Sequence, residues 1–359
     1  MRAAIADGSG AVTLTIVDDP APRSTEVIVQ VDSCGICGTD LHIIDGDYPA
    51  ARTPIVPGHE IAGTIVARGQ AARHLEEGVF VVVDPVVECG YCDQCRSGRT
   101  NLCVNWQGYG VTEPGGFAEF VRVRAVDVEP IPPSIPHEWA TLVEPVSCAL
   151  HALDRIGPIR AADRALVIGA GTTGLILCQL LAASGAIVDV VDLSSHRHLR
   201  AEGFGAHRTA ATVSDIDHSD GWDLVVEATG SVSGFQDGLD AVRPAGRFHV
   251  FGVSSPESIA RVSPYAIFAK ELTITGSQSL QHTFARAVHT VAAGAVNCAA
   301  LITARVPLPD IDTAIGLVRR GDGIKTQLLP GAAHGQPGSR RASGTNCRMP
   351  HGVQTPRQR

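Results

Sequence analysis

Short apolar runs recur at regular intervals through the middle of the chain, each bounded by polar residues or glycine. The runs that we interpret as strands are Ala165–Ile168, Ile187–Val191, Leu224–Glu227, Arg247–Phe251 and Leu272–Thr275. A helical stretch, Leu175–Ala183, separates the first run from the second. Apolar strands that alternate with helices are typical of a parallel sheet covered on both faces. The pattern therefore predicts a doubly wound α/β domain.

The first 150 residues have a different pattern: they are rich in Val, Thr, Gly and Pro and contain short runs in which apolar and polar residues alternate. Three segments there are typical of strands: Glu26–Asp32, Ile61–Ala67 and Phe120–Val123. Near the other end of the chain, Gln281–Ala293 and Ile311–Arg319 are predicted helices, and short strands return over residues 301–330. We expect this last stretch to complete the mostly β domain.

These patterns divide the chain into four parts. We expect a mostly β catalytic domain over residues 1–153 and the doubly wound domain over 154–282. Residues 283–330 are expected to return to the catalytic domain. From 331 to 359 Gly, Pro, Ser, Gln and Arg dominate, which is typical of a disordered tail.

Composition narrows the class of protein. The chain has 359 residues, of which 44% are hydrophobic, and this is enough for two domain cores. The longest apolar runs are too short to span a membrane, and no secretion signal precedes them. A formal net charge of −8 argues against nucleic acid or a membrane surface as partner. We therefore expect a cytoplasmic protein that binds a small molecule.

A G-x-G-x-x-G motif follows the first predicted strand of the α/β domain and opens its first predicted helix. Gly169 permits a tight turn, Gly171 lets the backbone approach a pyrophosphate, and Gly174 lets helix and strand pack closely. Thr172 and Thr173 stand at the helix N-terminus, where free N–H groups and the helix dipole attract phosphates. This context predicts a dinucleotide site rather than an ordinary glycine turn.

An acidic residue indicates which dinucleotide binds. Asp192 ends the second predicted strand, and a carboxylate there accepts hydrogen bonds from the adenosine ribose and repels a 2′-phosphate. The sequence therefore favours NAD over NADP. His196 and Arg197 follow closely and would soften that preference.

Four cysteines lie in one short loop, with the spacing C-x2-C-x2-C-x7-C. They are Cys89, Cys92, Cys95 and Cys103. Four thiolates around a tetrahedral zinc ion form a closed structural site, with no coordination position left for a substrate. In a chain without a secretion signal this spacing favours metal binding over disulfides. A zinc ribbon on nucleic acid is disfavoured by the acidic net charge.

A second set of metal-ligand side chains is scattered along the chain. Cys34 and Cys37 form a C-x-x-C, His59 and Glu60 are adjacent, and Glu144 stands much further on. Cys, His and carboxylate are the ligand types of an open zinc site that keeps a position for water or substrate. By itself the C-x-x-C is also typical of a thioredoxin-like redox centre.

Taken together, the segments resemble the zinc-containing medium-chain dehydrogenase/reductase family over about residues 1–330. The matching segments, in family order, are CGICGTDLH at 34–42, PGHEIAGTIV at 57–66, the four-cysteine loop, EPVSCALHAL at 144–153 and GAGTTG at 169–174. The Glu-Pro at 144–145 resembles the sorbitol, polyol and threonine dehydrogenase branch. The resemblance implies a GroES-like catalytic domain beside a Rossmann domain, and a homo-oligomer, with a tetramer favoured over a dimer.

The same resemblance implies roles for individual residues. Cys37, His59 and one glutamate are implied ligands of a catalytic zinc ion, and both Glu60 and Glu144 are candidates for the glutamate. Asp40 matches a residue that orients His59. Cys34 matches a cysteine that is not a ligand.

Two further residues are implied to move the proton. Zinc is expected to lower the pKa of the substrate hydroxyl, while Thr39 and His42 match a relay that carries its proton to solvent. The substrate carbon then gives hydride to NAD. Each chain would hold two zinc ions, one catalytic and one structural.

The expected function is therefore the NAD-dependent oxidation of a secondary alcohol, such as a polyol or a cyclitol, to a ketone. A threonine or butanediol dehydrogenase, an NADPH-dependent zinc carbonyl reductase and a binding protein that keeps the fold remain alternatives. Asp45, Tyr48 and Trp106 are candidates for a polar substrate pocket, and Lys325 is a candidate neighbour of the active cleft.

Overall fold

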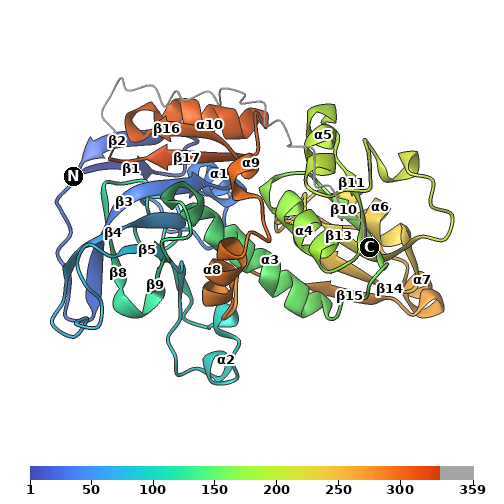
Figure 1. Ribbon diagram of the computed structural model, residues 1–359, viewed down its shortest axis with the longest axis horizontal. Coiled ribbons are helices and arrows are strands. Elements are labelled where there is room, and N and C mark those ends of the chain that lie inside the picture. The colour runs from blue at the N-terminus through green and yellow to red at the C-terminus, as the bar shows by residue number, and fades with distance from the viewer. Residues whose placement is uncertain (332–359) are drawn as a thin grey trace, which may run out of the picture.

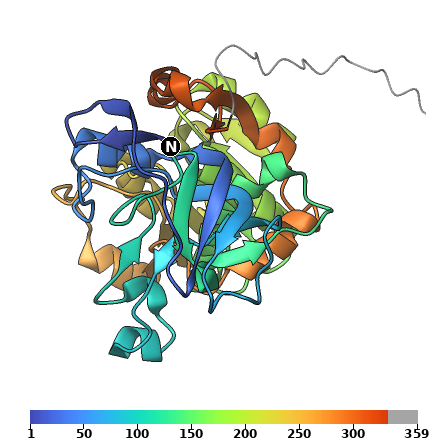
Figure 2. The same ribbon diagram turned by 90° about the vertical axis from the view of Figure 1, so that its left-hand side faces the viewer.

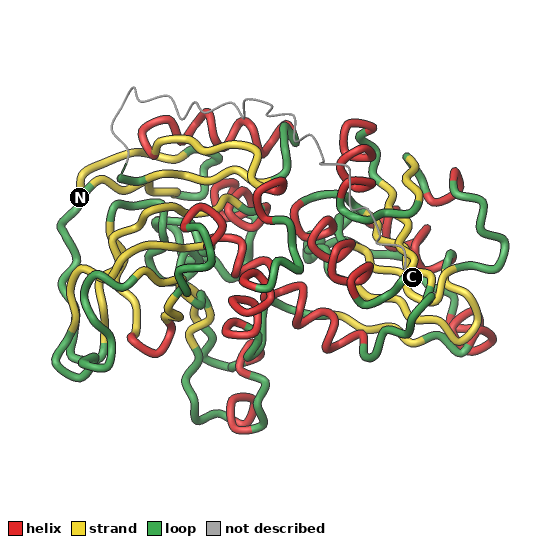
Figure 3. The backbone as a smooth tube through the Cα atoms, in the orientation of Figure 1, coloured by secondary structure: helices red, strands yellow, loops and turns green. Residues whose placement is uncertain are grey.

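The computed structural model describes residues 1–331 and is elongated, with two lobes (Figure 1). Strands dominate the first lobe, whereas helices surround a central sheet in the second (Figure 3). Helix α3 (Val143–Ile156) runs between the two lobes. Nearly all of the predicted disordered tail, residues 332–359, lies outside the described residues.

Seven strands form the main sheet of the first lobe, which Figure 2 views from its outer side. In sheet order, they are β16 (Ile302–Pro307), β17 (Lys325–Leu329), β3 (Glu26–Ile36), β4 (Glu60–Arg68), β5 (Phe80–Val83) and β9 (Val128–Pro130), with β8 (Phe120–Arg124) paired to β3. Because β17 pairs antiparallel with β3, the segment that begins at Lys325 lies beside the end of β3. Residues 302–329 thus join the sheet of the N-terminal segment.

Two small antiparallel sheets complete the β structure of this lobe. They are β1 (Arg2–Ala6) with β2 (Val12–Ile16), and β6 (Val86–Val87) with β7 (Gln107–Gly108). Six helices of the described residues do not belong to the second lobe's own set. They are α1 (Gly38–Asp45), α2 (Asp93–Arg96), α3, α8 (Phe284–Ala292), α9 (Cys298–Leu301) and α10 (Ile311–Arg320). Short 3₁₀ segments lie at Thr100–Leu102, Ala125–Asp127, His137–Leu142, Val213–Asp215 and Leu308–Asp310.

The second lobe contains a six-stranded parallel sheet. In sheet order its strands are β12 (Arg208–Ala210), β11 (Ile187–Val191), β10 (Arg164–Ile168), β13 (Trp222–Glu227), β14 (Val242–Val250) and β15 (Thr273–Gly276). Its helices are α4 (Thr172–Ala183), α5 (Ser195–Gly203), α6 (Val232–Asp240) and α7 (Pro264–Lys270). The strand order runs outward in both directions from β10 and β13, as in a doubly wound dinucleotide-binding fold. This confirms the predicted fold class.

The burial of successive residues in β10 explains why the run Ala165–Ile168 is wholly apolar. In β10, Ala165 and Val167 belong to the large core that also contains α3, α4 and α8. Leu166 and Ile168 belong to a separate core on the other face of the sheet. Both faces are thus buried, as the continuous apolar run predicts.

His249 of β14 makes the stability of this sheet depend on pH. Its side chain is buried, with Nδ1 2.8 Å from the Thr275 hydroxyl and Nε2 3.0 Å from the Ser277 hydroxyl. Burial lowers the pKa of His249 to about 4. As pH falls, the unfolded chain, in which the pKa of a histidine is about 6.5, therefore takes up a proton before the folded one. The stabilisation is complete above pH 6.5 and is lost as pH falls towards 4.

When the pH falls from 7 to 5, we expect His249 to lower the free energy of unfolding by about 2 kcal/mol. Denaturant unfolding of the wild type and of His249→Asn at both pH values measures the difference. An equal change in both proteins would contradict the assignment.

Candidate active site

Three ligand-type side chains meet where β3 ends and β4 begins. Cys37 directly follows β3 as the N-cap of α1, and Glu60, the first residue of β4, pairs in register with Gly35. The sulfur of Cys37, a ring nitrogen of His59 and a carboxylate oxygen of Glu60 lie within 4.8 Å of one another. These donors are close enough together, and of the right chemical types, to bind one zinc ion.

Asp40, the third residue of α1, holds two of these ligands in place. Its buried carboxylate accepts the backbone N–H of Cys37 at 2.8 Å and that of Gly58 at 3.1 Å. A third contact joins Asp40 Oδ1 to Nδ1 of His59 at 3.3 Å. Because Nδ1 faces Asp40, Nε2 of His59 is the nitrogen left for a metal. Burial disfavours the charged form of His59, but the Asp40 carboxylate raises its pKa well above the ordinary value.

The two candidate glutamates have different surroundings. Both oxygens of the buried Glu60 carboxylate contact the Lys325 ammonium, at 2.6 and 2.9 Å. Glu144, in the first turn of α3, lies outside the 4.8 Å cluster and accepts a hydrogen bond from the Cys148 thiol at 3.2 Å. Burial raises the pKa of Glu144. Of the two carboxylates, Glu144 is thus the one without a lysine or arginine partner in the described part of the chain.

The predicted relay residues lie on α1. Thr39 Oγ1 is 3.9 Å from the Cys37 sulfur, so its hydroxyl is beside the metal-ligand cluster. His42 is partly exposed one turn further on, and its Nδ1 is 2.9 Å from Asp47. Within residues 1–331 no direct hydrogen bond joins Thr39 to His42, so a relay between them needs a substrate hydroxyl or water. The relay stays a prediction.

The four-cysteine loop has the geometry of a closed metal site. Its sulfurs are 3.5 Å apart for Cys92 and Cys95, and 4.0 Å apart for Cys89–Cys95 and Cys92–Cys103. Four sulfurs at 2.3 Å from one zinc ion would stand about 3.8 Å apart. None of the nine cysteines within residues 1–331 forms a disulfide. The sulfur positions therefore suit zinc, as the spacing predicts.

This loop, which contains α2, projects from the first lobe (Figure 1) and is attached to the segment that precedes α8. Asn101 Nδ2 donates to the Gln278 carbonyl at 2.9 Å, and Gln281 Nε2 donates to the Gly98 carbonyl. The loop therefore contacts the connection between the two lobes.

The glycine motif lies at the C-terminal end of β10, beside the point where the strand order reverses. Gly169 has a φ of 103°, a value that favours glycine, and a Cβ atom on Gly174 would lie 1.8 Å from the Gly169 carbonyl oxygen. At Gly171, by contrast, the space is open. Apart from its two chain neighbours, no described residue has an atom within 4 Å of an added Cβ. The turn thus leaves space over Gly171, where the motif predicts the pyrophosphate.

Thr172, the first residue of α4, connects this turn to the other lobe. Its hydroxyl donates to the Ile324 carbonyl at 2.8 Å, and Ile324 immediately precedes Lys325. Thr173 follows in the same helical turn. The glycine turn and the metal-ligand cluster are therefore linked through one short segment.

Asp192 follows β11, as the sequence predicts. One of its oxygens accepts the backbone N–H of Ala170 at 2.8 Å, and the other accepts that of Ser194 at 2.9 Å. Arg197 Nη1 lies 3.2 Å from the first oxygen. Asp192 and Arg197 thus form an ion pair beside the glycine turn.

The three pocket candidates have different contacts. Asp45 forms an ion pair with Arg319 of α10 at the surface. Tyr48 and Trp106 both pack against a small core that contains Ile43. Burial raises the pKa of Tyr48. These two side chains remain candidates.

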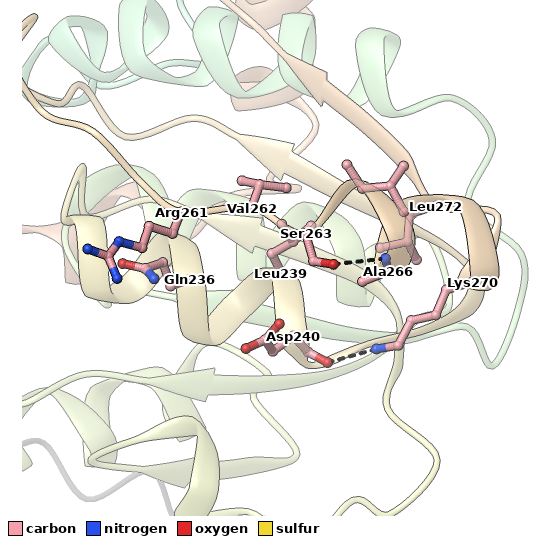
Figure 4. A pocket seen from close by; sticks show the side chains of 10 residues that line it. Gln236, Leu239, Asp240, Arg261, Val262, Ser263, Ala266, Lys270 and Leu272 are labelled. Atoms are coloured by element: carbon pink, nitrogen blue, oxygen red, sulfur yellow. Dashed lines mark hydrogen bonds between the residues drawn. The ribbon is translucent and has the colours of Figure 1, made fainter.

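A separate small cavity lies between α6 and α7 of the second lobe, lined by residues such as Asp240, Ser263 and Lys270 (Figure 4). None of the predicted site residues lines it. It is therefore not part of either site.

The sequence does not indicate the roles of two residues near the cluster. Gly35 was part of a matching segment but had no assigned role, and Lys325 was only a candidate neighbour of the cleft. Lys325 lies 265 positions from Glu60, so local spacing carries no sign of their contact.

Comparison with known proteins identifies the same two regions. Residues 23–133 match the alcohol dehydrogenase GroES-like domain, and residues 172–293 match the zinc-binding dehydrogenase domain. D-arabinitol dehydrogenase 1 of Uromyces fabae is 36% identical, over 87% of this chain and 92% of its own length. D-altritol 5-dehydrogenase of Agrobacterium fabrum is 34% identical, over 79% and 86%.

A solved structure extends the comparison to three dimensions. A zinc-binding dehydrogenase from Sinorhizobium meliloti 1021, bound to NADP, superposes with a TM-score of 0.86 and 29% identity. The match covers 92% of this chain and 99% of that one. Fold and site together define a zinc- and dinucleotide-dependent oxidoreductase. The chain belongs to the zinc-containing medium-chain dehydrogenase/reductase family, the family of the alcohol dehydrogenases.

Among the described residues, no helix has both the length and the apolar character that crossing a membrane requires.

Proposed function

We propose that the protein oxidises a secondary alcohol of a polyol, or of a related sugar alcohol or cyclitol, to a ketone, with NAD as hydride acceptor. The observation that carries the proposal is the cluster of Cys37, His59 and Glu60, linked to a dinucleotide turn by the Thr172–Ile324 hydrogen bond. The two relatives named for D-arabinitol and D-altritol support a polyol as substrate.

Each residue of the cluster has a defined task in this proposal. Cys37, His59 and one glutamate, Glu60 or Glu144, would hold the catalytic zinc ion, and Asp40 keeps His59 oriented through Nδ1. Glu60 already lies within the ligand cluster but pairs with Lys325, whereas Glu144 lies outside the cluster and forms no salt bridge with a lysine or arginine among the described residues. When bound, zinc supplies the Lewis acidity that lowers the pKa of a substrate hydroxyl. Thr39 would accept the substrate's proton while passing its own hydroxyl proton, through a water or a second substrate hydroxyl, to His42, which would release it to solvent.

NAD is proposed over NADP because Asp192 presents a carboxylate where a 2′-phosphate would have to lie. Arg197 reduces that repulsion, since its guanidinium already pairs with Asp192. We therefore expect NADP to be used, but with a lower kcat/KM than NAD.

A homo-oligomer, with a tetramer favoured over a dimer, is part of the proposal. β15 ends the parallel sheet with an open edge, and Tyr265 and Phe268 of the adjacent α7 are 75% and 79% exposed. An open edge beside exposed aromatic side chains is typical of a subunit contact. The cytoplasmic location stays a prediction.

The test mixes purified protein of known zinc content with NAD or NADP and a panel of polyols, and follows absorbance of the reduced nicotinamide. We expect turnover of at least one polyol, a higher kcat/KM with NAD, and loss of turnover with a chelator. The same panel contains threonine and 2,3-butanediol. Turnover confined to those two compounds would contradict the polyol proposal, and a zinc-loaded protein inactive on every alcohol would favour the binding-protein alternative.

A further inference from the structure

Glu227, the last residue of β13, carries a buried carboxylate without a cation. The residue is only 1% exposed, and within residues 1–331 it forms no ion pair with a lysine, an arginine or a histidine. Its Oε1 accepts the backbone N–H of Thr229 at 2.6 Å, the Thr229 hydroxyl, and the backbone N–H of Gly230 at 3.0 Å. Bonds of this kind stabilise an ionised carboxylate. Glu227 thus places an unbalanced negative charge inside the second lobe.

This charge lies where the strand order of the parallel sheet reverses. Glu227 pairs in register with Ile168, the residue that precedes the glycine turn. A Cβ atom on Gly169 would lie 2.7 Å from the methyl carbon of Thr229, so the loop after β13 touches that turn. A doubly wound sheet binds its dinucleotide across this point, with one mononucleotide over each half of the sheet. The carboxylate is therefore next to the dinucleotide site.

The acidic residue of the other half indicates which mononucleotide lies nearer. Asp192 follows β11, so the adenosine half of the dinucleotide belongs over β10, β11 and β12. The nicotinamide half then belongs over β13, β14 and β15. Glu227 ends the first strand of this second half. Asp192 is paired with Arg197, whereas Glu227 has no such partner among the described residues.

Hydride transfer changes the charge of the dinucleotide by one unit. The pyrophosphate carries two negative charges and the oxidised nicotinamide ring carries one positive charge. The ring becomes neutral when the alcohol carbon gives it a hydride, that is, a proton and two electrons, while the hydroxyl proton goes to solvent. NADH therefore has one more negative charge than NAD. A fixed carboxylate in a poorly solvated place repels NADH more strongly.

Two turns close around the carboxylate, and their shape alone does not require a charge. A Cβ atom on Gly252 would lie 2.8 Å from Oε2, and the backbone N–H groups of Phe251 and Gly252 donate to the Glu227 carbonyl at 2.9 Å. The donors of Thr229 and Gly230 need an acceptor at Oε1, which the uncharged oxygen of a glutamine would also provide. A carboxylate costs more to bury than an amide.

We propose that Glu227 is a specificity-determining residue whose buried charge favours the oxidised dinucleotide over the reduced one. The charge promotes binding of NAD and release of NADH, the order that alcohol oxidation needs. This inference rests on the proposed function, in which NAD is the hydride acceptor.

The experiment measures binding of both redox forms in the absence of alcohol. Fluorescence titration gives the Kd of NADH, and displacement of NADH by NAD gives the Kd of NAD. The variants separate charge from shape. Glu227→Gln keeps an acceptor at Oε1 and removes the charge, whereas Glu227→Asp keeps the charge and withdraws the acceptor. Thr229→Val is the matched control, because it removes one hydrogen bond to Oε1 and leaves the charge.

For Glu227→Gln we expect the ratio of the NADH Kd to the NAD Kd to fall roughly tenfold, the effect of one charge about 10 Å away at an effective dielectric constant of about 20. A tenfold change in this ratio raises the reduction potential of the bound two-electron couple by about 30 mV. Glu227→Asp and Thr229→Val should weaken binding of both forms and leave the ratio unchanged.

A purely structural role for Glu227 predicts the opposite pattern. An unchanged ratio in Glu227→Gln would overturn the proposal, and so would an equal change of the ratio in Glu227→Asp. Thermal unfolding of each variant shows whether it folds. If Glu227→Gln does not fold, Glu227→Asp decides, because a tenfold lower ratio in a variant that keeps the charge contradicts the proposal.

The same titrations with NADP and NADPH separate this inference from the proposed function. A protein that binds NADP but not NAD would contradict the choice of NAD, and the ratio for the NADP pair then decides the role of Glu227, since hydride transfer changes its charge equally. Inactivity on every polyol would contradict only the polyol part of the proposed function. Failure to bind either dinucleotide would contradict the dinucleotide site and this inference together.

Discussion

Replacing Cys37 by alanine is expected to lower kcat/KM for the best polyol by at least about 10⁴-fold, because the zinc ion held there would lower the pKa of the substrate hydroxyl. Zinc content should fall from two ions per chain to one, since the four-cysteine loop is a separate site. Elemental analysis and NADH absorbance measure the two quantities on the same sample.

Cys34→Ala is the control that separates a metal site from a redox site. Cys34 is buried, and burial raises the pKa of its thiol well above the ordinary value, so it is a poor redox partner. A metal site therefore predicts that Cys34→Ala keeps its zinc and most of its activity. If Cys37→Ala and Cys34→Ala lose activity equally while both retain two zinc ions, that result supports the C-x-x-C redox interpretation and contradicts the zinc assignment.

Two glycines of one turn should respond to alanine in different ways. At Gly174 the added Cβ would lie 1.8 Å from the Gly169 carbonyl oxygen, so we expect a lower melting temperature and weaker dinucleotide binding. At Gly171 the φ of −74° suits alanine, and the described residues leave space for its methyl group. Gly171→Ala should therefore keep its melting temperature, yet the methyl group would occupy space that the pyrophosphate needs.

For Gly171→Ala we expect the Kd for NAD to rise about 100-fold, roughly 2.7 kcal/mol of binding free energy. Fluorescence titration with NAD and thermal unfolding of the ligand-free protein measure both effects. Wild-type NAD affinity in Gly171→Ala would contradict the position assigned to the pyrophosphate, whatever happens to Gly174→Ala.

Several strands of the parallel sheet were predictable because burial on both faces makes them mostly apolar, although β11 includes the buried Asp189. The predicted strand Ile187–Val191 agrees with β11 residue for residue. β14 begins five residues before the predicted Arg247, because Pro244, Ala245 and Gly246 have the composition of a turn. In the structure Ala245 has a φ of 59°, and the pairing with β13 shifts in register between Trp222 and Leu224. An irregular strand of this kind lacks a simple apolar pattern.

Helix α3 was missed although its sequence matched a family segment. Pro145 lies in its first turn, where a helix tolerates proline. In a sequence, however, proline usually indicates that a helix ends or is interrupted. The helix carries polar residues at helical spacing, Glu144, Ser147, His151 and Asp154, but the first three are buried, so this stripe does not face solvent as it does in an ordinary amphipathic helix. Its placement between the lobes brings Glu144 near the cluster.

Sequence alone determined the features whose geometry lies within one short segment. The sulfur spacing of the four-cysteine loop and the turn at Gly169 both follow from neighbouring residues, because a loop of that length allows few arrangements. The surroundings of the two glutamates depend instead on strands that meet across the sheet. The pairing of β17 with β3 brings Lys325 to Glu60 over 265 positions, and the pairing of β3 with β4 puts Glu60, but not Glu144, in the cluster with Cys37 and His59. Tertiary structure decides such contacts because a cation 265 residues away leaves no periodic or local trace in the chain.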